Sequence, residues 1–158
     1  MVKYAFIVSC SFILGALVVE YKQHFYHETP EPIATLPDGG LYDGELRKGV
    51  LGGKGRISWP NESYYEGEFK DGLFHGDGIL HMPTFLYQGD FHLGIARGEG
   101  IISYDTGDQY TGEVDFSLPH GSGVLEQADG TIYKGEFKEG LYHGQGEYIS
   151  SDGDMYIG

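Results

Sequence analysis

The sequence has a single cysteine, Cys10, among its 158 residues. One thiol cannot form an intramolecular disulfide, and it cannot supply the several thiolates of a cysteine-based zinc site. Basic residues are also scarce, because 10 lysines and arginines stand against 24 aspartates and glutamates, for a formal net charge of −14. Nucleic-acid binding needs a basic surface, so this composition excludes a nucleic-acid partner.

Most of the negative charge lies beyond residue 41, where 20 acidic and 8 basic residues leave a balance of −12. This sign argues against direct binding of the region to anionic lipid, which attracts clusters of lysine and arginine. We expect the charges to form a solvated outer face. The serines lie in no nucleophile motif. We therefore expect a non-catalytic protein without cofactors or metals.

Glycine and tyrosine are abundant, with 27 and 13 copies. Both follow a repeated phrase, Tyr-x-Gly, whose copies are 22 or 23 residues apart. The phrase begins at Tyr42, Tyr65, Tyr87, Tyr110, Tyr133 and Tyr156. A fixed period of this length is typical of a repeat array, in which each unit buries its apolar face only against its neighbours. Residues 42–158 thus hold five complete units and the start of a sixth.

The units share the skeleton Y-x-G-(E/D)-(F/L/V), followed by H-G-x-G and, in its clearest form, an Asp-Gly turn. This skeleton resembles the MORN repeat, named for membrane occupation and recognition nexus. The departures are local, because Gly52 and Arg97 replace the histidine and Ser117 replaces a mid-repeat glycine. The resemblance covers residues 42–158 and implies an all-β fold, an elongated single antiparallel sheet of stacked β-hairpins.

Strand periodicity explains the glycines. Side chains alternate between the faces of a strand, which places Tyr133, Gly135 and Phe137 on one face. The return strand places Gly144 and Gly146 on the same face, so pairing lays aromatic rings over bare glycine backbone. The equivalent positions form the expected structural core: Tyr42, Gly44, Tyr65, Gly67, Phe69, Gly76, Gly78, Tyr87, Gly89, Phe91, Gly98, Gly100, Tyr110, Gly112, Gly121, Gly123, Tyr133, Gly135, Phe137, Gly144 and Gly146.

Residues 1–27 belong to no repeat, and the stretch from Tyr4 to Val19 carries no charge. As a helix this stretch would span ~24 Å, somewhat less than a hydrocarbon core of ~30 Å. We expect a short hydrophobic helix that acts as an uncleaved signal-anchor. A cleaved secretory signal and a helix packed on the end of the array are the alternatives.

The anchor predicts a single-pass membrane protein, attached through residues 4–19. Lys3 would lie on the cytoplasmic side by the positive-inside rule, and the repeats would lie outside the cytoplasm. Residues 28–41, with three prolines, would form an extended linker. Signal cleavage would instead give a secreted or periplasmic protein, and failure to insert would give a cytoplasmic one. Along the secretory pathway, the sequon at Asn61 would be a glycosylation site.

Two recurring residue types suggest chemistry, and the repeat geometry argues against both. His75, His120 and His143 share one repeat position, but successive units are two strands, or ~9.6 Å, apart. Two imidazoles cannot share a zinc ion across that gap, because their ligand distances are ~2 Å. Glu66 and Glu68 resemble a catalytic carboxylate pair, yet such acidic residues recur in every unit. We interpret them as part of a lattice of lysine and glutamate side chains.

The sequence therefore predicts a membrane-tethered scaffold whose sheet presents a groove to a protein partner or mediates self-association. Aromatic side chains carry much of the energy of interfaces. Five lie off the repeat core, near turns or edges, and are the candidate partner contacts: Trp59, Phe74, Phe85, Phe116 and Tyr142. The alternatives are a secreted repeat protein and a regulatory N-terminal fragment of a larger enzyme. The family resemblance implies a lipid kinase or a lysine methyltransferase for that enzyme.

Overall fold

The computed structural model describes residues 5–14, 17–26 and 32–158, and the chain divides into two units, residues 1–32 and 33–158. In the first unit, β1 (Ala5–Leu14) and β2 (Leu17–Tyr26) pair antiparallel. The helix expected within residues 1–27 is therefore not supported. The stretch is rich in valine, isoleucine, phenylalanine and tyrosine, which favour strands.

The remaining residues of the expected anchor and part of the expected linker, residues 1–4, 15–16 and 27–31, lie outside the described residues. In the part of the chain that is described, no helix has the length and apolar character to cross a bilayer.

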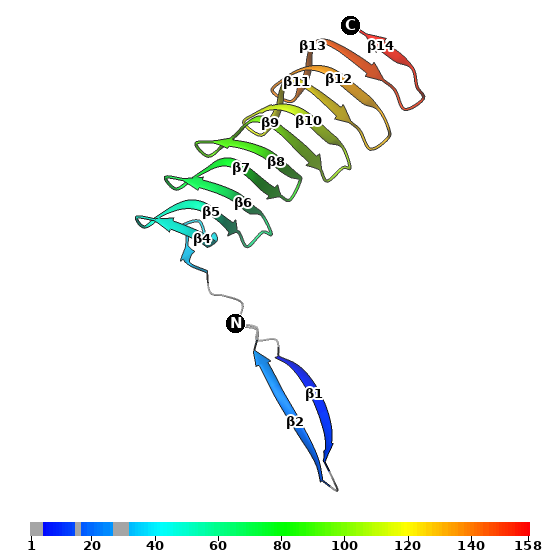
Figure 1. The fold of residues 1–158 in the computed structure, drawn as a ribbon. Coiled ribbons are helices and arrows are strands. Elements are labelled where there is room, and N and C mark those ends of the chain that lie inside the picture. Colours follow the sequence, from blue (N-terminus) through cyan, green and yellow to red (C-terminus); the bar gives the residue numbers. More distant parts are fainter. Residues whose placement is uncertain (1–4, 15–16, 27–31) are drawn as a thin grey trace. The chain divides into compact units, whose positions relative to one another are not determined.

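The second unit is one antiparallel sheet of twelve strands, in which neighbours in sequence are neighbours in space (Figure 1). The strands are β3 (Ala34–Thr35), β4 (Leu41–Arg47), β5 (Val50–Ser58), β6 (Tyr64–Lys70), β7 (Leu73–Met82), β8 (Phe85–His92), β9 (Ile95–Tyr104), β10 (Gln109–Asp115), β11 (Leu118–Glu126), β12 (Ile132–Lys138), β13 (Leu141–Ile149) and β14 (Met155–Ile157). The predicted all-β sheet of stacked hairpins is confirmed. Because β3 pairs with β4, residues 33–41 of the expected linker belong to this unit.

The turn inside each repeat needs two consecutive residues with positive φ. In the fifth unit Glu139 and Gly140 have φ values of 53° and 80°. Tight hairpin turns of this kind match the twist of the flanking strands, and glycine adopts positive φ without steric cost. The fourth unit instead has Ser117 at 61°, directly after Phe116 at 50°. This turn is therefore the least favourable of the five.

A β-bulge interrupts the pairing at the same place in every hairpin. In the fifth unit Gly135 lies opposite Gly146, but Glu136 lies opposite His143, so two residues beginning at Gly144 are extra. Gly144 has a φ of 55°, which favours glycine. The first glycine of the H-G-x-G phrase thus permits the bulge, whereas the second lies in the regular ladder.

The core is a row of aromatic rings on one face of the sheet, which we name the tyrosine face. Four of the ring-bearing side chains are fully buried: Tyr42, Tyr65, Tyr87 and Tyr110. Phe137 packs edge-on against Tyr110 and Tyr133, with ring centroids 4.9 and 5.1 Å away, so it joins two successive units. Such pairs contribute about 0.5–1.5 kcal/mol each beyond the burial of area.

Phenylalanine joins successive units elsewhere in the same way, with one exception. Phe69 contacts the tyrosines of the first and second units, and Phe91 contacts those of the second and third. The fourth unit has Val114 at this position, which is buried but has no ring. The third and fourth units therefore lack the aromatic contact that the other successive units have.

Candidate interaction groove

A continuous row of glycines crosses ten strands, from β4 to β13, with each glycine directly opposite the next. The row consists of Gly44, Gly55, Gly67, Gly78, Gly89, Gly100, Gly112, Gly123, Gly135 and Gly146. On the tyrosine face the rings lie on this row. A Cβ atom at Gly135 would lie 2.7 Å from Tyr133 Oη and 2.6 Å from Gly146 Cα. The rings therefore leave no space at these positions for a residue larger than glycine.

The tyrosine hydroxyls are also fixed by the backbone around the bulge. Tyr110 Oη donates to the carbonyl oxygen of Glu113 at 2.6 Å, and Tyr65 Oη donates to that of Glu68 at 2.8 Å. Burial raises the pKa of Tyr65, Tyr87 and Tyr110 to about 12. These three hydroxyls therefore remain protonated at physiological pH and stay bonded to the backbone.

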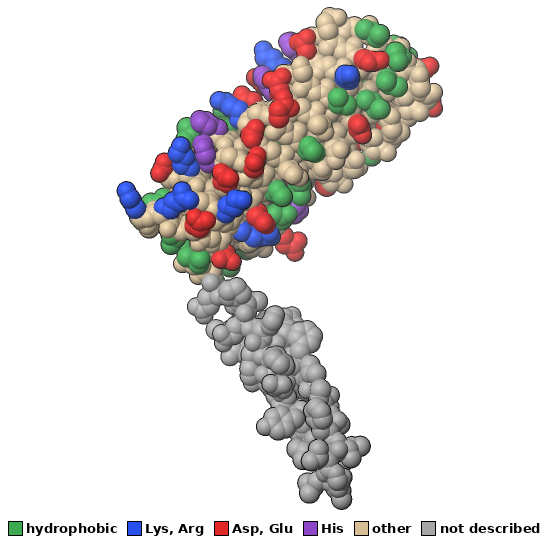
Figure 2. Space-filling view, viewed as in Figure 1, with side chains coloured by type: hydrophobic (Ala, Val, Ile, Leu, Met, Phe, Trp, Pro, Cys, Tyr) green, Lys and Arg blue, Asp and Glu red, His purple; other side chains and the backbone are tan. Residues whose placement is uncertain are grey.

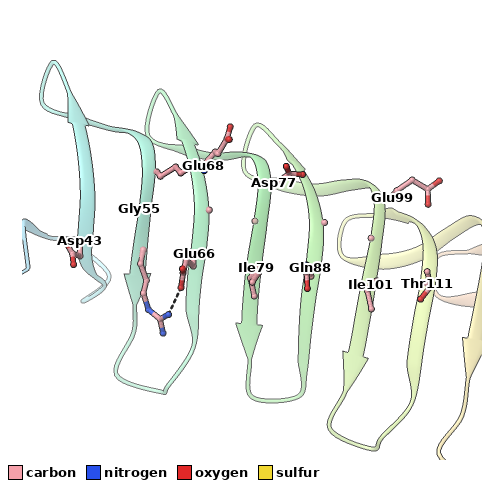
Figure 3. A pocket seen from close by; sticks show the side chains of 16 residues that line it. Asp43, Gly55, Glu66, Glu68, Asp77, Ile79, Gln88, Glu99, Ile101 and Thr111 are labelled. Atoms are coloured by element: carbon pink, nitrogen blue, oxygen red, sulfur yellow. Dashed lines mark hydrogen bonds and ion pairs between the residues drawn. The ribbon is translucent and has the colours of Figure 1, made fainter.

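The opposite face, which we name the groove face, carries an open groove of about 970 Å³ along the glycine row (Figure 3). Figure 3 shows one wall, with Glu66, Ile79, Gln88, Ile101 and Thr111, on one side of the glycines, and Glu68, Asp77 and Glu99 on the other side. Because Thr111 lies opposite Val124, the first wall leads into a smaller hollow of about 480 Å³ between β11 and β13.

Strand alternation positions the first wall. The residue between the tyrosine and the glycine of each Tyr-x-Gly phrase points away from the ring, as Gln88 does between Tyr87 and Gly89. Ile79 and Ile101 flank Gln88 on β7 and β9, each directly opposite it. Unlike the tyrosines, the residues between tyrosine and glycine differ in chemical type from unit to unit, as Glu66, Gln88 and Thr111 do.

Carboxylates outnumber the one lysine, Lys54, on the second wall, and Figure 2 shows aspartate and glutamate side chains following one another along the array. Asp77 lies directly opposite Asp90, and Glu99 lies directly opposite Glu113. Like charges in such pairs repel one another. The residues that the structure describes form three ion pairs, Arg47–Glu45, Arg56–Glu66 and Arg97–Asp115. No lysine takes part in them. The expected lysine and glutamate neighbours are present in the register, where Lys54 lies opposite Glu68 and Lys134 lies opposite Glu147, but they form no close ion pair among the described residues.

The repeated histidines lie beside the bulges, outside the groove. His75 lies opposite Glu68, and its ring centroid is 5.5 Å from that of His92. Its Nδ1 atom is buried without a hydrogen-bond partner. Within the described ranges, no group of three or more histidine, cysteine, aspartate or glutamate side chains is arranged to hold a metal ion.

Two of the five candidate contact aromatics pack on the tyrosines. Phe74 stacks on Tyr65 with ring centroids 3.7 Å apart, and Tyr142 stacks on Tyr133 at 3.9 Å. Phe74 is half-buried, whereas 46% of Tyr142 is exposed. Both rings therefore extend the aromatic core, and only Tyr142 has a substantial surface left for a partner.

The other three candidate contacts lie nearer the edges. Trp59 is half-buried and donates from Nε1 to Asp38 Oδ2 at 2.9 Å, and Phe85 packs against the core. Phe116 is 63% exposed, and the guanidinium of Arg97 lies 5.4 Å from its ring centroid. None of the five candidate aromatics lines the groove.

Asn61, the sequon residue, is exposed in the turn between β5 and β6, and its Oδ1 atom accepts a hydrogen bond from the backbone N–H of Ser63 at 3.3 Å. The side chain is thus held at the surface. Its glycosylation stays a prediction.

The glycine row, the tyrosine ladder and the bulge recur at the period of the sequence. A family model for the MORN repeat matches residues 42–64, 65–84, 87–109, 110–132 and 133–155, more than half of the chain. The chain belongs to the MORN repeat family. The resemblance drawn from the Tyr-x-Gly phrase is confirmed, and the matched MORN repeats begin at the same tyrosines. A comparison with curated proteins gives no match. The MORN repeats make this chain a repeat protein of the interaction-module type.

The wall residues of the groove were not predicted from the sequence as partner contacts. The predicted contacts are aromatic residues outside the repeat core, and these lie near turns and edges. A usable signal lay in the repeat itself. Tyrosine and glycine are constant within the Tyr-x-Gly phrase, whereas the residue between them is Asp43, Glu66, Gln88, Thr111 and Lys134 in turn. Positions that vary within a constant MORN repeat face outward from the shared core.

Proposed function

We propose that this MORN repeat protein is a non-catalytic scaffold that holds a protein partner in the groove of its sheet. The observation that carries the proposal is the open groove of about 970 Å³ on a sheet face that no other element of the second unit covers. A groove of this size, with a mixture of apolar and charged walls, suits a segment of another chain.

The contrast between the two faces supports this assignment. The tyrosine face repeats the same buried rings in every unit, so it offers little by which partners could be distinguished. The groove face presents a different set of side chains at each unit, including Glu66, Gln88 and Thr111. A sequence of different side chains along a rigid floor is the arrangement that specific recognition needs.

Site-specific photo-crosslinking in the native cell tests this proposal. A photoreactive residue at Thr111, which is exposed on the groove face, should yield an adduct of one defined added mass. The matched control carries the same residue at Asp152, which is exposed in the turn between β13 and β14. An adduct from Thr111 alone supports the groove, whereas equal adducts from both positions, or none from Thr111, contradict it.

Membrane attachment is a separate part of the proposal and rests on the uncharged stretch from Tyr4 to Val19. Alkaline carbonate extraction of membranes from cells that make the full chain tests it. Retention of full-length protein in the membrane pellet supports attachment. Release of full-length protein contradicts it. Release of a product shortened by about two kilodaltons, the mass of a short signal, makes the chain a secreted protein instead.

A further inference from the structure

The groove is narrow and runs across the strands, along the axis of the array. Its two walls stand two residues apart on each strand, for example Asp77 and Ile79 on β7 with Gly78 between them. Two residues of a strand span ~6.6 Å. An α-helix with its side chains is ~10–12 Å wide. An extended segment therefore fits between the walls, whereas a helix would rest on top of them.

The floor of the groove limits what can bind to it. The glycines of the floor, such as Gly78, Gly89 and Gly100, lie in strands that are paired on both sides. Their backbone donors and acceptors serve the sheet, so they have none left for a ligand strand lying across them. The bound segment must therefore adopt a conformation whose backbone needs no hydrogen bonds to the protein. Polyproline II is the extended conformation whose backbone remains solvated.

On β7 and β9 the carboxylates of the second wall have no basic counterpart, whereas on β5 Lys54 lies on this wall, directly opposite Glu68. Asp77 and Glu99 are exposed, and neither belongs to any of the three ion pairs among the described residues. Each also lies opposite another carboxylate, Asp90 or Glu113. A basic ligand would relieve this repulsion, because an opposite charge between two carboxylates favours both ionised forms. Charge complementarity thus selects lysine or arginine on the side of the ligand that faces this wall.

The spacing of the units sets the spacing of those basic residues. Asp77 on β7 and Glu99 on β9 are two strands apart, which corresponds to ~9.6 Å. Three residues of polyproline II advance ~9.3 Å and complete one turn, so every third side chain lies on the same edge. The two periods agree closely enough to stay in register over several units.

We propose that the groove binds a basic polyproline II segment with lysine or arginine at every third residue, placed opposite the second and third MORN repeats. This inference rests on the proposed function and gives the chemistry of the partner. A second edge of the segment carries apolar side chains against Ile79 and Ile101 on the first wall. The third edge faces solvent and is free to vary.

Fluorescence anisotropy with the full chain and synthetic peptides tests the inference. The probe peptide repeats the triplet Arg-Leu-Pro five times. One control peptide has the same composition with its arginines gathered at one end, and a second carries the same number of arginines on one face of a stable helix. The triplet peptide should bind about tenfold more tightly than either control, a difference that a general attraction between opposite charges does not produce.

Matched protein variants locate the binding. The double substitution Asp77→Asn with Glu99→Gln should weaken the triplet peptide about tenfold. The control, Asp105→Asn with Asp152→Asn, removes the same amount of charge at exposed turn positions and should change the affinity less than about twofold. Equal binding of all three peptides, preference for the helical peptide, or equal weakening by both double substitutions would overturn the inference. An adduct from Thr111 together with any of these results would leave the proposed function standing.

Discussion

The two faces of this sheet are made from the same strands, yet their side chains vary to different degrees from unit to unit. On the tyrosine face each unit repeats one arrangement, a buried ring on two glycines with its hydroxyl bonded to the backbone. On the groove face the same strands present a carboxylate, an isoleucine, a glutamine or a threonine. The motif that defines the MORN repeat thus maintains the fold. The side chains that vary from unit to unit lie on the groove face.

This division explains why the repeat signature alone does not reveal a partner. A unit must keep its tyrosine and glycines to stack, because it cannot bury its apolar face alone. Positions between them are free of that requirement. The comparison therefore predicts that substitutions on the tyrosine face change stability, and that substitutions on the groove face change binding.

The largest difference in stability is expected between substitutions of two tyrosines that lie on opposite faces. Tyr87 is fully buried, so Tyr87→Ala should lower the free energy of unfolding by about 3–5 kcal/mol. Tyr64, on the groove face, is half-buried between His81 and Arg56. Tyr64→Ala should cost less than about 1 kcal/mol, as for surface pairs. Chemical denaturation of both variants checks this, and similar losses would remove the distinction between the faces.

Alkaline pH should unfold the array through the tyrosine face. Burial raises the pKa of Tyr65, Tyr87 and Tyr110 from the ordinary value of 10.0 to about 12. The unfolded chain therefore loses these protons first. Stability is complete below pH 10 and falls as the pH rises from 10 to 12. Circular dichroism should follow tyrosinate absorbance through this window, whereas full ionisation of a still folded array would contradict the burial of the hydroxyls.

A smaller effect is expected at the turn of the fourth unit. Ser117 has a φ of 61°, whereas the other four units have glycine at this position. Ser117→Gly should raise the free energy of unfolding by about 1 kcal/mol, because it removes a left-handed conformation that serine adopts at a cost. The reciprocal change, Gly140→Ser in the fifth unit, should lower it by about 1 kcal/mol. Melting temperatures that move in the same direction for both variants would refute this explanation.

The smallest effect on stability is expected on the groove face. Asp77→Asn removes one of two like charges that lie directly opposite, so it should raise stability by about 0.2–1 kcal/mol at low salt. The gain should shrink as salt screens the repulsion. Asp105→Asn is the matched control, because Asp105 is exposed in a turn. A loss of stability for Asp77→Asn would indicate that Asp77 supports the fold.

The repeat period and strand alternation predicted the sheet and the packing of rings on glycine, because both depend on residues that recur. The bulge was not predicted. Strict alternation assigns Gly144 and Gly146 the same role, whereas Gly144 permits a positive φ and Gly146 lies under a ring. The sequence does not distinguish these two positions, because both require glycine.

Two further differences concern residues outside the Tyr-x-Gly and H-G-x-G phrases. Tyr142 was predicted to lie off the repeat core, whereas period two from Gly144 and Gly146 places its ring on the tyrosine face, where it stacks on Tyr133. Its contact with a partner stays a prediction. The expected helix near the N-terminus rested on hydropathy alone, and hydropathy does not distinguish a helix from the strands β1 and β2.

The division between the faces is tested most directly by placing the same residue at two adjacent positions. Gly135→Val puts a side chain against Tyr133 and Gly146, so it should cost about 3 kcal/mol or unfold the fifth unit. Lys134→Val puts the same side chain on the groove face, where Lys134 is exposed, and should change stability by less than about 0.5 kcal/mol. Denaturant unfolding of both variants gives the answer. A large loss for Gly135→Val alone is the predicted result, and equal losses or the reverse order would contradict it.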